Sequence, residues 1–379
     1  MTLKSKIKKQ LQLLRLLDCR LLYEHYCKKE AVNPRQILMT SLSRSSLSGN
    51  LYYIDQQLKG TDYEVKYAFY HKKTLSWSEK KELCRLLATS AFVLIDDVYY
   101  IVYGIPFRKE TKLIQVWHAL GAFKRVGAAI EGKQDAMPVT HRNYDATVVS
   151  SQGIVDDYAR AFGIDRKKVL PLGVARTDVF FSQDYRTSVR QRLYEKYPQL
   201  AGKKVILFAP TFRQKGRGAQ YYDFDRIDLE RLQELGDDYR CIIKLHPFIT
   251  NTYRGCKSDF FLDLTSEREI NDLLFITDYL ITDYSSVIFE GALLKVKTIF
   301  YAYDLEEYAS GRSFFYPFET YAIGPVVRNE DDLLACIRNY RRDETRFEEF
   351  YQKFMGACDG HSAERFVRTV IQGGLHDNT

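Results

Sequence analysis

Short apolar runs of strand length alternate with helix-like segments along most of this chain, and this alternation constrains the fold more than any other feature. The expected strands cover residues 36–40, 65–70, 92–96, 112–117, 146–150 and 168–172, and then 204–209, 240–245, 260–264, 279–282 and 298–301. Helices are expected near 78–89, 153–161, 185–196, 228–235, 266–275, 286–294 and in 329–373. Strands separated by helices pair in parallel and are covered by helices on both faces. The sequence therefore predicts an α/β protein with two doubly wound domains in series.

The length of 379 residues also favours two domains, because it exceeds what one core usually serves. The expected parts are a basic amphipathic helix (1–30), an N-terminal domain (31–175), a C-terminal domain (176–340) and C-terminal helices that pack back across the domains (341–379). Ligands of doubly wound sheets bind at the carboxyl ends of the strands. With two such domains, we expect the site in the cleft that they form.

The N-terminal segment has apolar residues at helical spacing and a basic opposite face. Its apolar positions are Leu3, Ile7, Leu11, Leu14, Leu17 and Leu21. Such a helix either lies on an anionic membrane surface or docks on its own domain with a solvated basic face. The net charge of +7 suits an anionic partner such as a nucleotide or an acidic membrane.

Cysteine usage and hydropathy point to the inside of the cell. The seven cysteines are odd in number and form no C-x-x-C pair, which favours buried thiols in a reducing compartment. No apolar run approaches the roughly 20 residues that span a bilayer, and no signal peptide is visible. We expect a cytoplasmic protein or one on the inner face of a membrane.

The segment 278–290 reads as a strand, a tight turn and a helix. Ser285 or Ser286 can cap this helix, and helix N-termini with nearby hydroxyls attract phosphate. The plainer interpretation is an ordinary capped helix after a buried strand. Thr282 adds a hydroxyl, Asp283 orders the turn that presents the serines, and Glu290 could accept from ribose hydroxyls one turn into the helix.

Polar side chains also follow three other expected strands. His118 follows 112–117, where it could take a proton from a substrate hydroxyl, or be tied into its turn. Thr211 and Arg213 follow 204–209, and the guanidinium fork suits phosphate oxygens, although loop arginines are often only solvated. His246 follows 240–245 and could donate to a diphosphate, favouring departure of an anionic leaving group.

Several common active-site motifs are absent from the sequence. These are the P-loop, the G-x-G-x-x-G loop after the first strand, the G-x-S-x-G elbow and H-E-x-x-H. Their absence argues against ATP-driven phosphoryl transfer, NAD chemistry, serine hydrolysis and zinc hydrolysis. The candidate hydroxyl, arginine and histidine donors can hold a diphosphate without an obligatory cofactor. Binding of Mg²⁺ stays an alternative, because Asp283 and Asp304 are available as ligands.

Six segments resemble, in family order, motifs of the CDP-glycerol glycerophosphotransferases, which prime and polymerise teichoic acids. They read QVWHALGAFKRVG (115–127), GVARTD (173–178), ILFAPTFR (206–213), KLHP (244–247), TDYSSVIFE (282–290) and YAYDLEEY followed by Gly311-Arg312. Each motif alone is modest, but the six together are highly specific. The resemblance implies a GT-B fold, with two Rossmann-like domains and the nucleotide held mostly by the second.

The resemblance also implies a reaction. An acceptor hydroxyl, deprotonated by His118, attacks the phosphorus attached to the alditol of CDP-glycerol or CDP-ribitol, and CMP leaves. The residues expected at the donor diphosphate and nucleotide are Thr211, Arg213, His246, Thr282, Asp283, Ser285, Ser286 and Glu290. The candidate acceptor or alditol contacts are Lys124, Asp304, Glu307 and Arg312. The implied acceptor is lipid-linked, which favours a peripheral protein on the inner membrane face; no nucleic-acid partner and no bound metal are expected.

Four positions depart from the family pattern. They are Ala119 for the glycine after the histidine, Ala175 for a proline, Glu290 for an aspartate, and Gly311-Arg312 in reversed order. These departures leave open the alditol, the acceptor, and whether one unit or many are added. A GT-B glycosyltransferase that uses a nucleotide sugar, and a non-catalytic scaffold on the same fold, remain as alternatives.

Overall fold

The computed structural model describes residues 3–71, 74–130, 141, 143–214, 220–246, 248–251, 253, 258–267, 270–311, 314–373 and 375. These residues form two compact units. Unit 1 comprises Met1–Asp178 and Lys353–Thr379, and unit 2 comprises Val179–Gln352. The chain thus passes from unit 1 to unit 2 after Asp178 and returns after Gln352, where the sequence-based boundaries stand at 175/176 and 340/341.

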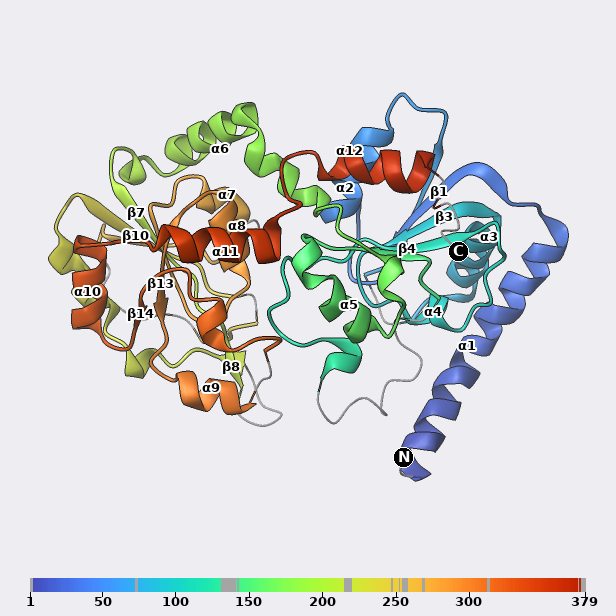
Figure 1. Ribbon diagram of the computed structural model, residues 1–379, viewed down its shortest axis with the longest axis horizontal. Helices are drawn as coiled ribbons and strands as arrows, with labels where there is room; N and C mark the ends of the chain where they lie inside the picture. The colour runs from blue at the N-terminus through green and yellow to red at the C-terminus, as the bar shows by residue number, and fades with distance from the viewer. Residues whose placement is uncertain are drawn as a thin grey trace. The chain divides into compact units, whose positions relative to one another are not determined.

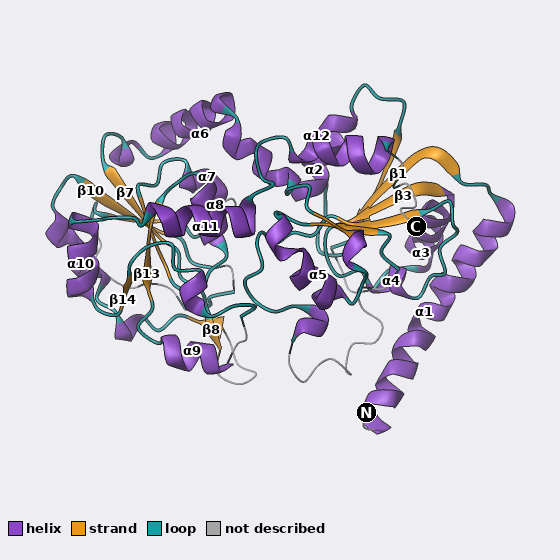
Figure 2. Ribbon diagram, in the orientation of Figure 1, coloured by secondary structure: helices purple, strands orange, loops and turns teal. Residues whose placement is uncertain are grey.

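Unit 1 is built on a six-stranded sheet with the order β2-β1-β3-β4-β5-β6, and every neighbouring pair is parallel. Figures 1 and 2 show the strands β1 and β3 of this sheet side by side. The strands are β1 (Asn33–Ser41), β2 (Glu64–Phe69), β3 (Ser90–Ile95), β4 (Lys112–Gln115), β5 (Ala146–Val148) and β6 (Val169–Leu170). Its helices are α1 (Leu3–Lys29), α2 (Gly49–Leu58), α3 (Trp77–Thr89), α4 (Tyr100–Tyr103), α5 (Val155–Phe162) and α12 (Ser362–Phe366). A π-helical segment, Val367–Gln372, continues α12.

The C-terminal segment completes the core of unit 1. Ile37 and Met39 alternate along β1 and pack in one cluster with Ile54 of α2 and with Phe366 and Val370. Because period-2 alternation sends every second side chain to the same face, one face of the sheet is covered by α2 and by α12 with its π-helical extension. The C-terminal helix α12 therefore belongs to unit 1, the unit that also contains the N-terminal part of the chain.

The described half of α1 docks on unit 1 through one face and leaves the other face in solvent. Cys19 and Tyr23 are 1% exposed, and the carbonyl oxygen of Cys19 accepts from the Cys84 thiol of α3 at 3.3 Å. Leu17 and Leu21 are 46% and 57% exposed. The side chains of Leu3, Ile7, Leu11 and Leu14 lie outside the described part, but Figure 1 shows the N-terminal turns of α1 projecting away from unit 1.

Unit 2 has the order β11-β10-β7-β12-β13-β14, again wholly parallel. The strands are β7 (Lys204–Phe208), β10 (Tyr239–Ile243), β11 (Phe261–Asp263), β12 (Tyr279–Thr282), β13 (Lys297–Tyr301) and β14 (Val326–Val327). The helices are α6 (Gln183–Lys196), α7 (Ile270–Leu274), α8 (Val287–Leu293), α9 (Leu305–Gly311), α10 (Glu330–Arg338) and α11 (Glu344–Met355). A short antiparallel pair, β8 (Arg213–Gln214) and β9 (Gln220–Tyr221), forms a separate two-stranded sheet. Numbered in chain order within this sheet, its six strands stand as 3-2-1-4-5-6, the order of Rossmann folds.

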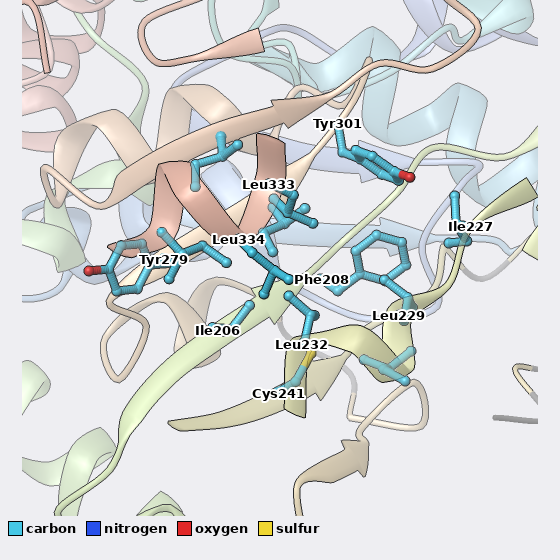
Figure 3. Close-up of a cluster of buried hydrophobic side chains, with 14 of the residues drawn as sticks. Ile206, Phe208, Ile227, Leu229, Leu232, Cys241, Tyr279, Tyr301, Leu333 and Leu334 are labelled. Carbon is cyan, nitrogen blue, oxygen red and sulfur yellow. The ribbon is translucent and has the colours of Figure 1, made fainter. Parts of the chain in front are cut away.

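Both faces of this sheet are buried. Ile206 and Phe208 of β7 pack with Leu333 and Leu334 of α10 (Figure 3). Val205 and Leu207, which alternate with them, pack in a second cluster with α6, α7 and α8. This two-sided burial explains why the strands read as continuous apolar runs rather than as alternating ones.

The expected strands are present in both units, and the differences lie in the short elements. The sequence does not predict β14, α4 or α9, because elements of two to seven residues are too short to show a period. The expected helix at 228–235 is a 3-10 segment, Leu229–Leu235. None of the helices in the described residues is long and apolar enough to cross a bilayer.

The buried imidazole of His141 should make unit 1 sensitive to acid. His141 stacks on Phe162 at 4.3 Å, its Nδ1 lies 3.1 Å from the Tyr144 hydroxyl, and burial lowers its pKa to about 4. Between pH 6.5 and 4 the unfolded chain binds a proton that the folded chain does not, so stability falls as the pH falls. Denaturant unfolding at pH 7.5 and 4.5 should show about 2.5 kcal/mol of loss from this group.

The variant His141→Phe isolates that contribution. A phenyl ring can keep the stack on Phe162, and the Tyr144 hydroxyl retains Tyr103 at 2.8 Å and Gln115 at 3.0 Å. The free energy of unfolding of the variant should depend less on pH over this interval. Equal pH dependence of the two proteins would show that His141 titrates normally.

Candidate active site

The strand order of unit 2 reverses between β7 and β12, and the loops after these strands are bonded to each other. The amide of Ala209 donates to the carbonyl oxygen of Ile281 at 2.9 Å, and the Thr282 hydroxyl donates to the carbonyl oxygen of Ala209 at 2.7 Å. The amide of Thr211 donates to the Asp283 carboxylate at 2.7 Å. Doubly wound sheets bind ligands at such a reversal, so Thr211, Thr282 and Asp283 lie at the expected kind of position.

Arg213 lies at the centre of these loops and is only 8% exposed. Its Nε and Nη2 donate to the two oxygens of Asp304 at 2.6 and 2.9 Å, which is a bidentate pair. Its Nη1 donates to the carbonyl oxygen of Thr211 at 2.6 Å and lies 2.9 Å from Oδ2 of Asp283. One side chain thus joins the loops that follow β7, β12 and β13.

Aromatic rings enclose the Arg213 guanidinium. The rings of Tyr222, Tyr284, Tyr303 and Tyr308 lie 5.0–5.7 Å from its central carbon. Burial disfavours the charge, but the carboxylates of Asp283 and Asp304 outweigh burial and hold the pKa of Arg213 above its usual range. The cluster therefore keeps one cation and two anions inside the fold.

This arrangement differs from the role that the sequence suggests for Arg213. The sequence predicts a guanidinium fork offered to phosphate, whereas the structure uses the fork to hold Asp283 and Asp304. Asp283 and Asp304, which the sequence analysis named as possible Mg²⁺ ligands, are both paired with Arg213. The Oγ1 atom of Thr211 is buried and has no hydrogen-bond partner among the described residues.

The serine pair lies at the start of α8. Ser286 occupies the N-cap position without a side-chain cap bond, and the Ser285 hydroxyl accepts from the Val287 amide at 3.4 Å. Ser286 is exposed and Ser285 is half-buried, so both hydroxyls can be reached from solvent. Glu290 lies one turn further along and is buried.

His246 lies after β10, with its ring between two aromatic neighbours. Its Nδ1 accepts from the Phe248 amide at 3.1 Å, and its ring centre lies 5.0 Å from that of Phe212 and 4.8 Å from that of Phe248. Because Nδ1 accepts a hydrogen bond, the proton of the neutral ring resides on Nε2. The ring can therefore donate from Nε2, as the sequence-based role requires.

Of the candidate acceptor contacts, Asp304 belongs to this cluster through its bidentate pair with Arg213. Glu307 is exposed and lies 3.5 Å from Arg226. Lys124 belongs to unit 1, where its ammonium lies 5.9 Å from the centre of the Phe123 ring. Arg312 lies outside the described residues.

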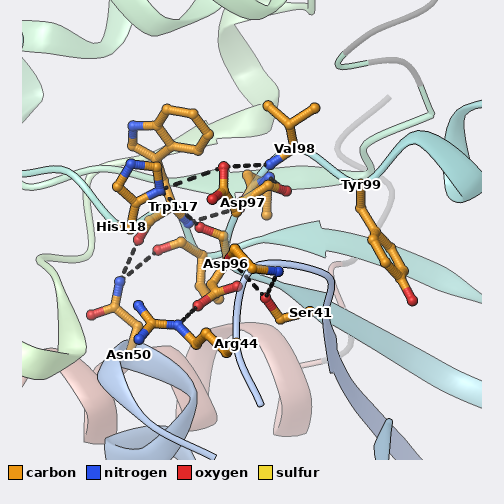
Figure 4. A network of polar contacts seen from close by, with 12 residues as sticks. Ser41, Arg44, Asn50, Asp96, Asp97, Val98, Tyr99, Trp117 and His118 are labelled. Atoms are coloured by element: carbon orange, nitrogen blue, oxygen red, sulfur yellow. Dashed lines mark hydrogen bonds and ion pairs between the residues drawn. The ribbon is translucent and has the colours of Figure 1, made fainter. Parts of the chain in front are cut away.

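In unit 1, His118 follows β4 in a loop held by buried polar contacts (Figure 4). Its side chain is 44% exposed, and its Nδ1 lies 3.2 Å from the carbonyl oxygen of Asp96. Trp117 has a positive φ of 34°, which is strained for a bulky residue. Asn50 supports this backbone, because its amide nitrogen donates to the carbonyl oxygens of Val116, at 2.9 Å, and of Trp117.

The residues that surround His118 come from loops that the sequence analysis did not single out. Arg44 follows β1 and forms an ion pair with Asp96, which follows β3 together with Asp97. Asn50 also accepts from the Arg176 amide at 3.0 Å. The signal that finds His118, a polar residue directly after a strand, applies equally to Asp96 and Asp97.

The sequence of this chain is similar to that of several known proteins. A sequence model of the CDP-glycerol:poly(glycerophosphate) glycerophosphotransferase family matches residues 21–372. The teichoic acid ribitol-phosphate polymerase TarK of Staphylococcus aureus is 40% identical over 89% of this chain and 68% of its own length. A poly(ribitol-phosphate) polymerase of Bacillus spizizenii is 38% identical over 90% of this chain and 56% of its own length.

The sequence identity of the relatives to this chain differs according to the alditol that appears in their names. Those named for ribitol phosphate are 38–40% identical to this chain, and those named for glycerol phosphate 27–29%. A solved structure of the wall teichoic acid polymerase TagF matches with a TM-score of 0.75 at 22% identity, over 99% of this chain and 98% of that one. This likeness confirms the predicted α/β class with two doubly wound domains of the GT-B type.

The Arg213 cluster should be required for the stability of unit 2. Removing the cation in Arg213→Ala leaves two buried carboxylates unpaired, so the free energy of unfolding should fall by about 3–5 kcal/mol. Arg231 provides the matched control, because it pairs with Glu234 and Asp331 at 2.8 and 2.7 Å near the surface. Arg231→Ala should cost no more than about 1 kcal/mol.

Denaturant unfolding of both variants and of Arg213→Lys separates the two roles of Arg213. A lysine keeps the charge but cannot bind Asp304 through two parallel hydrogen bonds, so we expect an intermediate loss of stability. If Arg213→Ala were as stable as Arg231→Ala and lost only affinity for the nucleotide donor, the residue would be a ligand contact and not a support.

Proposed function

Because the chain belongs to the CDP-glycerol:poly(glycerophosphate) glycerophosphotransferase family, we propose that it transfers an alditol phosphate from a CDP-alditol to a hydroxyl of a lipid-linked acceptor, with release of CMP. The product is a teichoic acid or a related cell-wall or capsule polymer. The family match across residues 21–372 carries this proposal, since it includes both His118 and the donor-side loops of unit 2. The higher identity to ribitol-phosphate enzymes favours CDP-ribitol over CDP-glycerol.

In this proposal unit 2 holds the donor. The hydroxyls of Thr211, Ser285 and Ser286 and the Nε2–H of His246 donate to diphosphate oxygens. Arg213 acts indirectly, by keeping the Thr211 loop and the Asp283 turn in place. Phosphoryl transfer depends mainly on positioning and on neutralising charge, which such a set of donors can supply without an obligatory cofactor.

His118 of unit 1 acts as the base. Its Nδ1 faces the carbonyl oxygen of Asp96, so Nδ1 carries the proton and Nε2 is left to accept one. The acceptor oxygen gives its proton to Nε2 and forms a bond to the phosphorus that bears the alditol. The bond from this phosphorus to the bridging oxygen breaks, and the electron pair leaves on CMP, whose phosphate accepts from His246.

A donor screen tests the reaction. Purified protein is incubated with a lipid-linked saccharide acceptor and CDP-ribitol, CDP-glycerol or a UDP-sugar, with and without EDTA, and the released nucleotide is measured. We expect CMP release, fastest with CDP-ribitol, and a kcat at least about 100-fold lower in His118→Ala. His361→Ala is the control, because His361 is exposed and pairs with Glu364 at 3.2 Å.

Other outcomes of this screen select the alternatives. Transfer of a sugar from the UDP-sugar, with no CMP release, would identify a glycosyltransferase. Turnover of none of the donors would leave a binding protein on this fold. Loss of CMP release in EDTA would contradict the absence of an obligatory metal.

We also propose that the protein binds the cytoplasmic face of the cell membrane through α1. Cys19 and Tyr23 dock this helix on unit 1, while Leu17 and Leu21 remain exposed on its other face. An apolar stripe flanked by basic residues suits an anionic bilayer surface, where a lipid-linked acceptor lies. This supports a peripheral attachment.

Vesicle sedimentation tests the membrane attachment. The double variant Leu17→Asp/Leu21→Asp should bind vesicles of phosphatidylglycerol and phosphatidylcholine at least tenfold more weakly. The reason is that each leucine buried in the bilayer contributes about 1.5–3 kcal/mol. Val326→Asp, at an exposed apolar position of unit 2, should bind as the unchanged protein does. Equal sedimentation of all three proteins would contradict a role for this stripe.

A further inference from the structure

Asp97 presents a carboxylate to the ring of His118. Its Oδ1 lies 3.8 Å from Nδ1 of His118, which is too long for a hydrogen bond but within the range of an ion pair. The side chain of Asp97 is 34% exposed, and Figure 4 shows it beside the imidazole. The nearest acceptor of Nδ1, at 3.2 Å, is the carbonyl oxygen of Asp96.

The position of Asp97 is fixed by its own contacts. Its Oδ1 accepts from the Val98 amide at 2.7 Å, and its carbonyl oxygen accepts from the Gln115 side chain at 3.1 Å. The preceding Asp96 is anchored by its ion pair with Arg44. The carboxylate is therefore held in place before any ligand binds.

Asp97 is the carboxylate that acts on the ring, although Asp96 is adjacent. The Asp96 carboxylate is buried and its charge is compensated by Arg44, so only its carbonyl oxygen meets His118. The other charged group that meets this residue is Arg176, whose Nη2 donates to the carbonyl oxygen of His118 at 3.3 Å. Among the described residues, Asp97 thus supplies the negative charge that faces Nδ1.

We propose that Asp97 is a positioning residue for His118, which orients the ring and stabilises its protonated form during transfer. The proposal rests on the function proposed above, in which Nε2 of His118 takes the proton of the acceptor hydroxyl. When that proton arrives, the ring becomes a cation with both nitrogens protonated. An anion 3.8 Å from Nδ1 then stabilises the charge that forms, and the neutral ring gains much less from it.

Two measurements on Asp97→Asn test this role. The first is an NMR measurement of the two neutral tautomers of the His118 ring at fixed pH without substrate, which does not depend on any enzymatic activity. Loss of the anion should lower the share of the tautomer with the proton on Nδ1, because the carboxylate favours a proton on the nitrogen that faces it. The second is the steady-state rate of CMP release, where kcat should fall about tenfold because the anion no longer stabilises the cation that forms during transfer.

Conservative and control variants separate positioning from folding. Asp97→Glu keeps the charge and should recover part of kcat, while the KM for the CDP-alditol stays unchanged in both variants. Asp62→Asn removes an exposed carboxylate of unit 1 that pairs with Arg35 at 3.4 Å, and should change neither readout.

An unchanged tautomer ratio in Asp97→Asn would overturn the proposal, whether or not the protein is a transferase. A loss of kcat that Asp97→Glu does not partly recover would also overturn it, because that pattern indicates a structural role only. A changed tautomer ratio in a protein that turns over no CDP-alditol would uphold the His118–Asp97 pairing and reject the proposed reaction instead.

Discussion

The donor-side loops of unit 2 depend on one buried ion cluster. Arg213 binds Asp304 through two parallel hydrogen bonds, faces Asp283, and so joins segments that follow three different strands. Removing these charges from water is costly, and only close, bidentate geometry with further hydrogen bonds offsets that cost. The benefit is placement: the Thr211 amide and the Asp283 turn are held rigidly beside the strand reversal. A preorganised site of this kind suits phosphoryl transfer, where positioning contributes most of the catalysis.

Polar contacts also hold the loops of unit 1, through neutral groups and one ion pair. Asn50 ties the strained backbone around Trp117, and the carbonyl oxygen of Asp96 fixes the orientation of the His118 ring. In both units the candidate site residues stand on short loops, and their positions are set by polar contacts from neighbouring loops at the carboxyl ends of parallel strands. Arg44 and Asp96, like Arg213 and Asp304, support those loops from beneath.

Most of the fold, and part of the site, could be predicted from the sequence. Apolar strand runs identify eleven of the strands because buried parallel strands leave a strong local signal, whereas the two-residue β14 leaves none. His118 and Thr211 are singled out because each follows an expected strand, and ligands of doubly wound sheets bind at the carboxyl ends of the strands. The same rule would have found Asp97. The pairing of Arg213 with Asp304 could not be predicted from the sequence, since the two residues are 91 positions apart.

The α/β class, the two domains, the family and the strand ends where polar groups gather can be read from the sequence, because these depend on local periodicity and short motifs. Which of those groups meet depends on the order of the strands in the folded sheet. Arg213 and Asp304 are 91 residues apart, and they form a pair because β7, β12 and β13 are neighbours in the sheet. Strand order results from packing over the whole unit, and no local pattern records it. For this reason the sequence predicts a phosphate contact at Arg213, whereas the structure shows its guanidinium paired with Asp283 and Asp304.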